Sequence, residues 1–312
     1  MRYIVLILFA QYLVHITNML GHISVLLTGV IILSIQPNRI SCERLIETTD
    51  DITFYLYTRS NRDDPQALRS NDLTDLSSSN FNSSLPNYIV FHGIDNNYKS
   101  SLYIKDPLLN AADVNLFLVD YSRPASSWTW AEDATVETAP IIAQYIDLIK
   151  DQHNVDSDNF ILVGFSLGCH IAGKTGKLLN GDIDTIIALD PPGISPFYID
   201  ASVARYVQVI HSSNFGTQTS VGRADFFANT NKREQPGCNQ DLRCSHFRAT
   251  KYYAESLASG GFTAVKCDSY ESFSAGLCDG NAKAHLGGVN LDKSASGSYY
   301  LSTNSQRPFS RG

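Results

Sequence analysis

Short apolar runs recur along the chain and are separated by stretches with helical periodicity. Those with the length and composition of strands are Ile52–Tyr57, Tyr88–His92, Val114–Val119, Phe160–Gly164, Ile183–Leu189 and Tyr206–Ile210. Several are apolar throughout, which is typical of strands covered on both faces. The clearest helical segment lies at Ala131–His153, where apolar residues recur every three or four positions. This alternation predicts an α/β fold with a mostly parallel central sheet and helices on both faces.

The region from residue 37 to residue 312 is predicted to form one domain, because no repeat and no linker divides it. With 312 residues, 43% of them hydrophobic, the chain is able to bury a large core. Its formal net charge is -7 and it has no Lys/Arg-rich run, which argues against nucleic acid as a partner. Nothing in the sequence indicates a cofactor or a required protein partner.

The first residues differ from the rest of the chain. Tyr3–Ile35 is almost wholly apolar and contains no Asp, Glu, Lys or Arg. Residues 1–36 are therefore predicted to be a signal peptide or, as the alternative, an uncleaved signal anchor. Met19 is a candidate start that would give a signal peptide of ordinary length. We expect this segment to be removed, because the run lacks a stop-transfer flank. The protein is therefore expected to be secreted and extracellular.

The cysteines are consistent with export. The chain has 6, at positions 42, 169, 238, 244, 267 and 278. Cys238 with Cys244 and Cys267 with Cys278 are local pairs, for which disulfides are the expected state in an exported protein. Metal ligation is the alternative, although the spacings are not those of a zinc knuckle. Asn82 begins a glycosylation sequon within residues 70–84, a polar stretch predicted to be a surface loop.

The pentapeptide Gly164–Gly168 has the pattern G-x-S-x-G, with Ser166 at its centre. An apolar strand precedes it, and Cys169–Asn180 after it is a plausible helix. A sharp strand-to-helix turn needs small residues on both sides of the serine, and the helix N-terminus directs free N–H groups toward developing negative charge. This context predicts that Ser166 is a nucleophile. A glycine-rich turn that only packs is the alternative.

A serine nucleophile needs a base and an acid that orients the base. Asp190 follows an apolar run directly, which places its carboxylate at the carboxyl edge of the sheet, whereas Asp182 and Asp184 precede that run. Asp200 and Asp225 lack this placement. Of the 8 histidines, His246 follows Asp190 in order and lies beside a potential cross-link. The residues alone leave His211 and His285 as alternatives for the base.

An oxyanion site needs two main-chain donors. Leu167 supplies one N–H as the residue after the nucleophile. Ile94, in the sequence Phe91-His92-Gly93-Ile94 after an early strand, is the candidate for the second. An ordinary strand-to-loop turn is the alternative interpretation of this segment.

Taken together, these residues resemble the pancreatic lipase family, and within it the short insect-type lipases and the venom phospholipases A1. The resemblance runs from about Asp51 to Phe309. It is carried by Phe91-His92-Gly93, Gly164–His170, Ala188–Pro191, Gly222–Phe227, Gln235–Cys238 and Cys244–His246.

The resemblance implies an α/β-hydrolase fold in which Ser166, Asp190 and His246 hydrolyse a lipid ester at a lipid surface. It also implies the bridges Cys238–Cys244, which closes a lid, and Cys267–Cys278. The lid between the first two cysteines, Asn239–Arg243, is short, and in this family short lids accompany phospholipase A1 activity. Triacylglycerol or galactolipid hydrolysis is the second expectation, and a non-catalytic carrier of yolk-protein type is the rival from another class.

Three departures from the family pattern carry further expectations. Cys169 stands where alanine is usual, and we expect it to be free and buried. Cys42 has no evident partner. The acidic cluster that binds calcium in some relatives is represented at best by Asp200, so no metal is expected.

Overall fold

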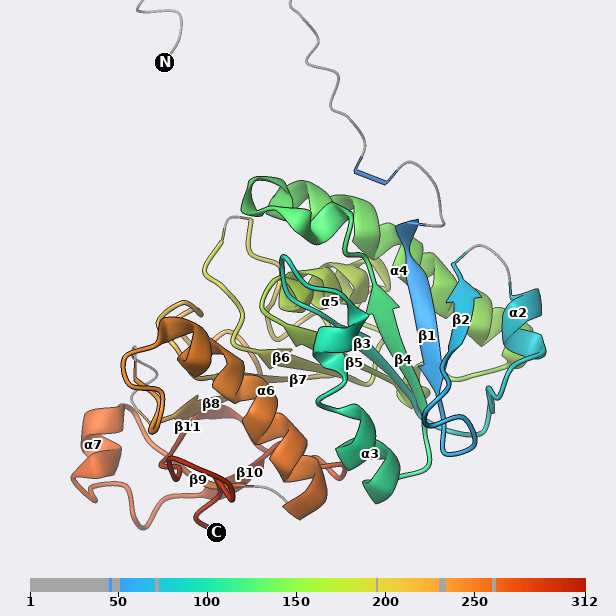
Figure 1. Ribbon diagram of the computed structural model, residues 1–312. Coiled ribbons are helices and arrows are strands. Elements are labelled where there is room, and N and C mark those ends of the chain that lie inside the picture. Colours follow the sequence, from blue (N-terminus) through green and yellow to red (C-terminus); the bar gives the residue numbers. More distant parts are fainter. Residues whose placement is uncertain (1–44, 47–50, 71–72, 195, 230–233, 260–261) are drawn as a thin grey trace, which may run out of the picture. The chain divides into compact units, whose positions relative to one another are not determined.

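An 11-stranded sheet runs through the part of the chain that the structure describes (Figure 1). The computed structural model describes residues 45–46, 51–70, 73–194, 196–229, 234–259 and 262–312, all within one compact unit, Arg44–Gly312. The predicted leader at 1–36, Met19 and Cys42 lie outside the described residues. No described helix is long and apolar enough to cross a membrane. The single domain at 37–312 stays a prediction.

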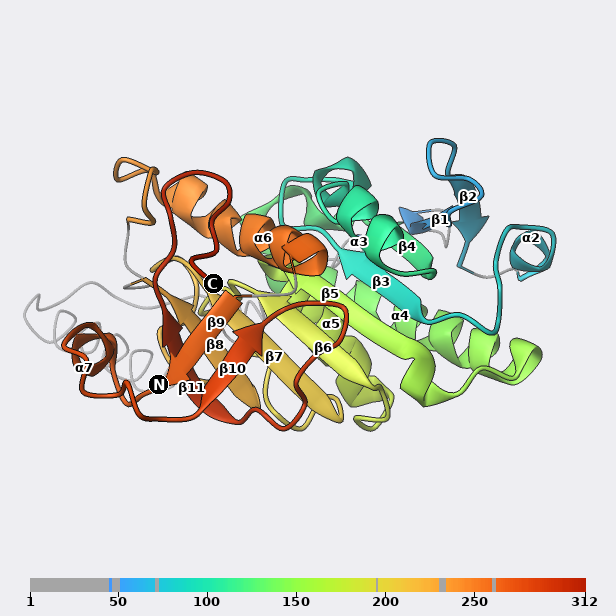
Figure 2. The same cartoon turned by 90° about the horizontal axis from the view of Figure 1, so that it is seen from below.

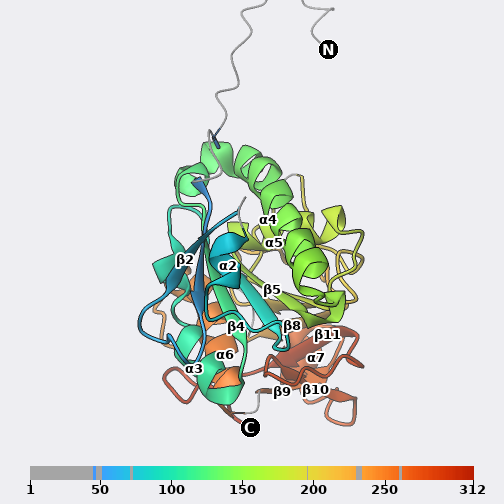
Figure 3. The ribbon, with the colours of Figure 1, turned by 90° about the vertical axis from the view of Figure 1, so that its right-hand side faces the viewer.

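The strand order is β10-β9-β11-β8-β7-β6-β5-β3-β4-β1-β2. Neighbours pair in parallel through β4 (Asn115–Asp120), β3 (Asn87–Phe91), β5 (Phe160–Phe165), β6 (Thr185–Leu189), β7 (Tyr206–His211), β8 (Ala224–Ala228) and β11 (Gly297–Leu301). The edges are antiparallel, with β1 (Thr53–Tyr57) and β2 (Gln66–Arg69) at one end, nearest the viewer in Figure 3, and β9 (Phe262–Lys266) and β10 (Lys283–Leu286) at the other.

Helices cover both faces of the sheet, as predicted. Figure 2 shows α4 (Ala131–His153) and α5 (Leu167–Leu178) on one side of the sheet and α3 (Lys105–Ala111) and α6 (Leu242–Ser259) on the other. The remaining helical turns are short: α2 (Thr74–Ser77), α7 (Tyr270–Ser274), and the 3₁₀ turns η2 (Tyr98–Ser101), η3 (Pro124–Ser126), η4 (Trp128–Trp130) and η5 (Ser157–Asn159). Because α2 falls within residues 70–84, that stretch is not wholly a loop as predicted.

Two hydrophobic cores form because side chains alternate between the faces of each strand. In β3, Ile89 and Phe91 join the core beneath α4 and α5, while Val90 joins the core beneath α3 and α6. All of these side chains are fully buried. Continuous apolar runs are therefore required in the central strands, which is why those strands were recognisable in the sequence.

The carboxyl ends of the parallel strands meet at one edge of the sheet. Ser166 follows β5, Asp190 follows β6, and His92 follows β3. The main chain joins these ends, since Ser166 N donates to Leu189 O at 3.0 Å and Asp190 N donates to Ile210 O at 2.8 Å. The candidate residues from three strands are thus assembled at the edge where open parallel sheets bind ligands.

Candidate active site

Ser166 lies at a strained turn between β5 and α5. Its backbone has φ 54° and ψ −124°, a conformation that residues other than glycine rarely adopt. The flanking glycines allow the turn because a Cβ on Gly164 would lie 2.4 Å from Gly168 O, and one on Gly168 would lie 2.5 Å from Phe91 O. Ser166 thus lies directly between β5 and α5, the position at which the sequence pattern predicts a nucleophile.

Asp190 and His246 form a buried pair beside this turn. His246 Nδ1 donates to Asp190 Oδ2 at 2.6 Å, across 56 positions of sequence. The carboxylate also accepts from Ser212 N at 2.8 Å, from Ser213 N at 3.1 Å and from Ser213 Oγ. Asp190 is fully buried, so water does not solvate its carboxylate. These three donors stabilise the charge in place of water.

The pair fixes which nitrogen of His246 faces the cavity. Since Nδ1 donates to the aspartate, Nε2 of the neutral ring is the acceptor. This Nε2 is buried and has no hydrogen-bond partner within the described residues. Phe165 and Phe215 pack against the imidazole with ring centroids 4.6 and 4.8 Å away, which holds its orientation.

A cavity of about 390 Å³ opens over these groups and is lined by both Ser166 and His246. Much of its wall is apolar, formed by Ile94, Trp128, Phe165, Phe215, Leu242 and Phe247. Polar groups at the wall are Asp95, Asn96 and Arg243. Mostly apolar walls with a few polar groups are typical of a site for a small organic molecule. The cavity has room for an acyl chain next to Ser166.

The loop after β3 passes directly over the nucleophile. A Cβ on Gly93 would lie 3.2 Å from Ser166 Cβ, so the adjoining Ile94 amide lies close to the serine. Leu167 N is at the first position of α5, where helix amides lack an internal partner. Among the described residues, neither Ile94 N nor Leu167 N donates to a protein acceptor. Both predicted oxyanion donors are therefore free beside Ser166.

His92 holds that loop in place, a role that the sequence analysis did not predict. Its Nδ1 donates to Gly93 O at 2.7 Å, which fixes the peptide that carries the Ile94 amide. Its Nε2 accepts from Tyr121 N at 3.3 Å, and Tyr121 Oη donates to His92 O. Burial lowers the pKa of His92 to about 4, so the ring is neutral at physiological pH, as this bonding pattern requires. The only signal in the sequence is a His-Gly pair directly after a strand.

The alternative bases lie away from the cavity. His211 is fully buried, with Nε2 bonded to Asp225 at 2.9 Å and Nδ1 facing Thr217 O at 3.1 Å. His285 is exposed on the edge strand β10. Neither side chain lines the cavity of Ser166. His246 alone among these candidates does.

The alternative acids are engaged elsewhere. Asp225 is the partner of His211, and the exposed Asp200 accepts from Ser202 N at 2.7 Å. Asp182 and Asp184 lie before β6 and form ion pairs with Arg205 and Lys293 at 2.6 Å each. Asp190 is thus the carboxylate that the fold brings to Ser166 and His246. The structure describes no cluster of metal-ligating side chains.

The two predicted disulfides, Cys238–Cys244 and Cys267–Cys278, are present, and Cys169 is free and buried. The first closes the segment predicted as a lid, but α6 begins within it at Leu242. Asp241 starts this helix, since its Oδ1 accepts from Cys244 N at 3.1 Å. The segment is therefore a helix start and not a flap. Asn82 is exposed in the turn after α2.

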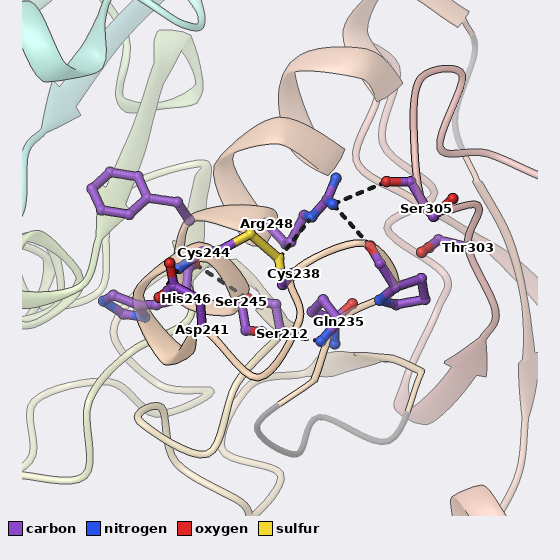
Figure 4. Close-up of a disulfide and its surroundings, with 12 residues drawn as sticks. Ser212, Gln235, Cys238, Asp241, Cys244, Ser245, His246, Arg248, Thr303 and Ser305 are labelled. Carbon is purple, nitrogen blue, oxygen red and sulfur yellow. Dashed lines mark hydrogen bonds between the residues drawn. A yellow bond between two sulfur atoms is a disulfide. The ribbon is translucent and has the colours of Figure 1, made fainter.

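Arg248 ties the disulfide loop to the region after β11 (Figure 4). Its guanidinium donates to Pro236 O at 2.8 Å and to Ser305 O at 3.0 Å, and lies 4.5 Å from the ring centroid of Phe309. Its Nε lies 3.3 Å from Cys238 Sγ. The first turns of α6, which carry His246, are held by these contacts.

A mostly parallel sheet with a serine at a strained strand-to-helix turn, beside a buried histidine–aspartate pair, is characteristic of an α/β-hydrolase fold. The chain belongs to the Lipase family, whose model matches residues 34–309. The resemblance to pancreatic lipases predicted from the sequence is thereby confirmed.

Three curated relatives illustrate the match. Pancreatic lipase-related protein 2 of Cavia porcellus is 30% identical over an alignment of 246 residues that covers 72% of this chain and 56% of that protein. Pancreatic triacylglycerol lipase of Sus scrofa is 30% identical over an alignment of 266 residues, which covers 73% of this chain and 58% of that protein. Inactive pancreatic lipase-related protein 1 of Homo sapiens is 28% identical over an alignment of 263 residues, which covers 72% of this chain and 56% of that protein. The chain thus spans about half the length of the curated relatives that it matches.

Proposed function

We propose that this chain is a carboxylic ester hydrolase for glycerolipids, with Ser166 as nucleophile, His246 as general base and Asp190 as the orienting acid. The observation that carries the proposal is the partner-free Nε2 of His246, which Asp190 holds in the acceptor tautomer at the cavity that contains Ser166. A satisfied structural histidine would have both ring nitrogens engaged, as His211 does.

The reaction follows from this geometry. His246 Nε2 takes the Ser166 proton as Oγ attacks the ester carbonyl. The amides of Leu167 and Ile94 stabilise the tetrahedral oxyanion. His246 then protonates the departing alcohol, and water repeats the sequence to release the fatty acid. No cofactor or metal enters any of these steps.

A fluorophosphonate probe tests the nucleophile, because labelling requires an activated serine. We expect a label on Ser166 that is lost in Ser166→Ala and in His246→Ala and retained in Ser220→Ala, an exposed serine outside the cavity. Turnover of a short-chain nitrophenyl ester is expected to fall to a common residual level in the first two variants. A label that persists in Ser166→Ala would contradict the proposal.

Within this activity, we propose a preference for phospholipids of the phospholipase A1 type. A long lid hides an apolar cleft until it meets lipid. Here the corresponding segment is short, and its last residues, Leu242 and Arg243, are fixed in α6. The alternatives are triacylglycerol and galactolipid hydrolysis, and similarity to the pancreatic triacylglycerol lipase of Sus scrofa favours the first of these.

Rates on phosphatidylcholine, trioleoylglycerol and a galactolipid decide between these substrates. Each rate is taken below and above the solubility limit of the lipid. We expect phosphatidylcholine to be the best substrate, with little activation at the interface. A sharp rise in the triglyceride rate at that limit, with the phospholipid inert, contradicts the preference but leaves the ester hydrolase intact.

A non-catalytic lipid carrier of yolk-protein type is the second candidate, and the relative named inactive gives it weight. The presence of Ser166 and His246 at one cavity, with Asp190 bonded to His246, argues against it. Binding of lipid by the purified protein without turnover of any ester would establish the carrier instead.

We also propose that the protein is secreted and meets lipid at a surface. The two disulfides suit an oxidising compartment. Trp128 and Phe215 at the cavity are 46% and 37% exposed and pack against each other with ring centroids 5.3 Å apart, which offers an apolar contact. Mass spectrometry of protein recovered from the culture medium tests export, leader removal and glycosylation at Asn82.

A further inference from the structure

Two opposite charges line the cavity of Ser166, and among the described residues neither has an ion-pair partner. Arg243 lies in the first turn of α6, with its guanidinium 5.8 Å from the ring centroid of Phe247. Asp95 lies in the loop after β3, next to Ile94. Both are exposed, and within the described residues neither forms an ion pair. They also do not pair with each other, so the charged ends are separated by more than the length of an ion pair.

The backbone of each of these two residues has a defined place in the fold. Arg243 precedes His246 by three residues, so the two side chains share a face of α6. Asp95 has a left-handed backbone, φ 51°, and its amide donates to Ala125 O at 2.7 Å. The carboxylate nearest Arg243 in sequence, Asp241, is occupied by the Cys244 amide and does not line the cavity.

This pattern complements a zwitterion. A guanidinium binds phosphate oxygens through paired N–H groups. A carboxylate and an exposed indole together attract a quaternary ammonium, and Trp128 lines the same cavity. The N-terminus of α6, where Arg243 lies, adds positive potential on the phosphate side. In a glycerophospholipid, the phosphate is attached to the same glycerol unit as the ester that Ser166 attacks.

We propose that Arg243 and Asp95 form a subsite for the head group of a zwitterionic phospholipid. Arg243 binds the phosphate, and Asp95 with Trp128 receives the ammonium. This inference rests on the proposed function of the site, because it presumes that an ester is held over Ser166. It narrows the substrate class to phospholipids whose head group carries both charges.

Monomeric short-chain lipids test the subsite without interference from a membrane surface. The substrates are dihexanoyl phosphatidylcholine, dihexanoyl phosphatidylglycerol and dihexanoylglycerol, all below their aggregation limits. Arg243→Gln is expected to lower the rate on both phospholipids about tenfold relative to dihexanoylglycerol, since a charged hydrogen bond is lost. Asp95→Asn is expected to lower the ratio of phosphatidylcholine to phosphatidylglycerol turnover about fivefold.

Matched controls are Arg307→Gln and Asp64→Asn, which alter exposed charges outside the cavity and are expected to leave all ratios unchanged. Ratios that also stay constant in Arg243→Gln and Asp95→Asn overturn the subsite, as does an equal loss on all three lipids. If the wild-type protein turns over none of the lipids, the proposed function itself fails. If the wild-type protein turns over dihexanoylglycerol but the ratios stay constant in both variants, the subsite is wrong and the proposed hydrolase activity stands.

Discussion

Replacing His211 by alanine is expected to destabilise the fold and spare turnover, whereas His246→Ala is expected to abolish turnover. Both histidines are buried, both follow Asp190 in the chain, and both bond to an aspartate, at 2.9 Å and 2.6 Å. They differ at the second nitrogen. His211 Nδ1 faces Thr217 O, while His246 Nε2 is free at the cavity.

The magnitude follows from what each change leaves behind. His211→Ala leaves the buried Asp225 carboxylate with only the amides of Val221 and Gly222. Breaking a buried pair costs about 3–5 kcal/mol. For a domain of this size the midpoint of thermal unfolding should fall by roughly 6 to 20 °C. His246→Ala removes the base and should lower kcat by about 10⁶-fold, because triad members act as a unit.

The assay pairs calorimetry with initial rates on a short-chain nitrophenyl ester. Rates are measured well below the unfolding midpoint of each variant, so that stability does not limit turnover. We expect kcat of His211→Ala to stay within about tenfold of wild type, the loss reflecting looser placement of Ser212 and Ser213 around Asp190. A His211→Ala protein with a native midpoint and no turnover, beside an active His246→Ala, would refute the assignment of the base.

Four further outcomes are expected. Gly93→Ala should lower kcat by about tenfold to a hundredfold with little change in stability, because the added Cβ lies 3.2 Å from Ser166 Cβ; unchanged kinetics would contradict the position of this loop. Burial lowers the pKa of His170 to about 4, below its value of 6.5 in the unfolded chain. Because the unfolded chain binds the proton more readily, about 3 kcal/mol of the free energy of unfolding is present above pH 6.5 and is lost as the pH falls toward 4. His170→Gln should flatten the pH dependence of the unfolding free energy in that range, and an unaltered slope would exclude this cause. Cys169 should resist iodoacetamide in the native protein, since burial raises the pKa of its thiol, and peptide mapping that finds a Cys42–Cys169 link would contradict a free thiol. Activity should survive a strong calcium chelator, and a loss restored by added calcium would overturn the expected absence of a metal.

The sequence predicted strands β1, β3, β4, β5, β6 and β7, but it did not predict β2, β8, β9, β10 and β11. Strands such as β5, with every residue buried, are apolar throughout and stand out from their surroundings. In β10 buried and exposed residues alternate over only Lys283–Leu286, too short a run to distinguish from a loop. β8 was missed because the buried Asp225 interrupts its apolar pattern. This carboxylate is stabilised by His211, which lies in another strand, and by the amides of Val221 and Gly222.

The residues of the candidate site also differ in how far the sequence alone predicts their positions. Ser166 and Asp190 are attached to recognisable strands, so their placement follows from local sequence. His246 is positioned by the packing of α6 on the sheet, which no local pattern encodes, and only the family resemblance selected it. The role of His92 was missed, because its hydrogen bonds depend on the fold around Gly93 and Tyr121.

The contacts of Arg248 also set an order of assembly during synthesis. Ser166, Asp190 and His246 all leave the ribosome before Ser305 and Phe309 exist. Until then, the guanidinium lacks one of its carbonyl acceptors and the ring that covers it. A nascent chain stalled at residue 303 should therefore react poorly with a fluorophosphonate, whereas one carried past residue 309 and released should react fully. The proposed lipid-cleaving activity would then arise only after this part of the chain has been made.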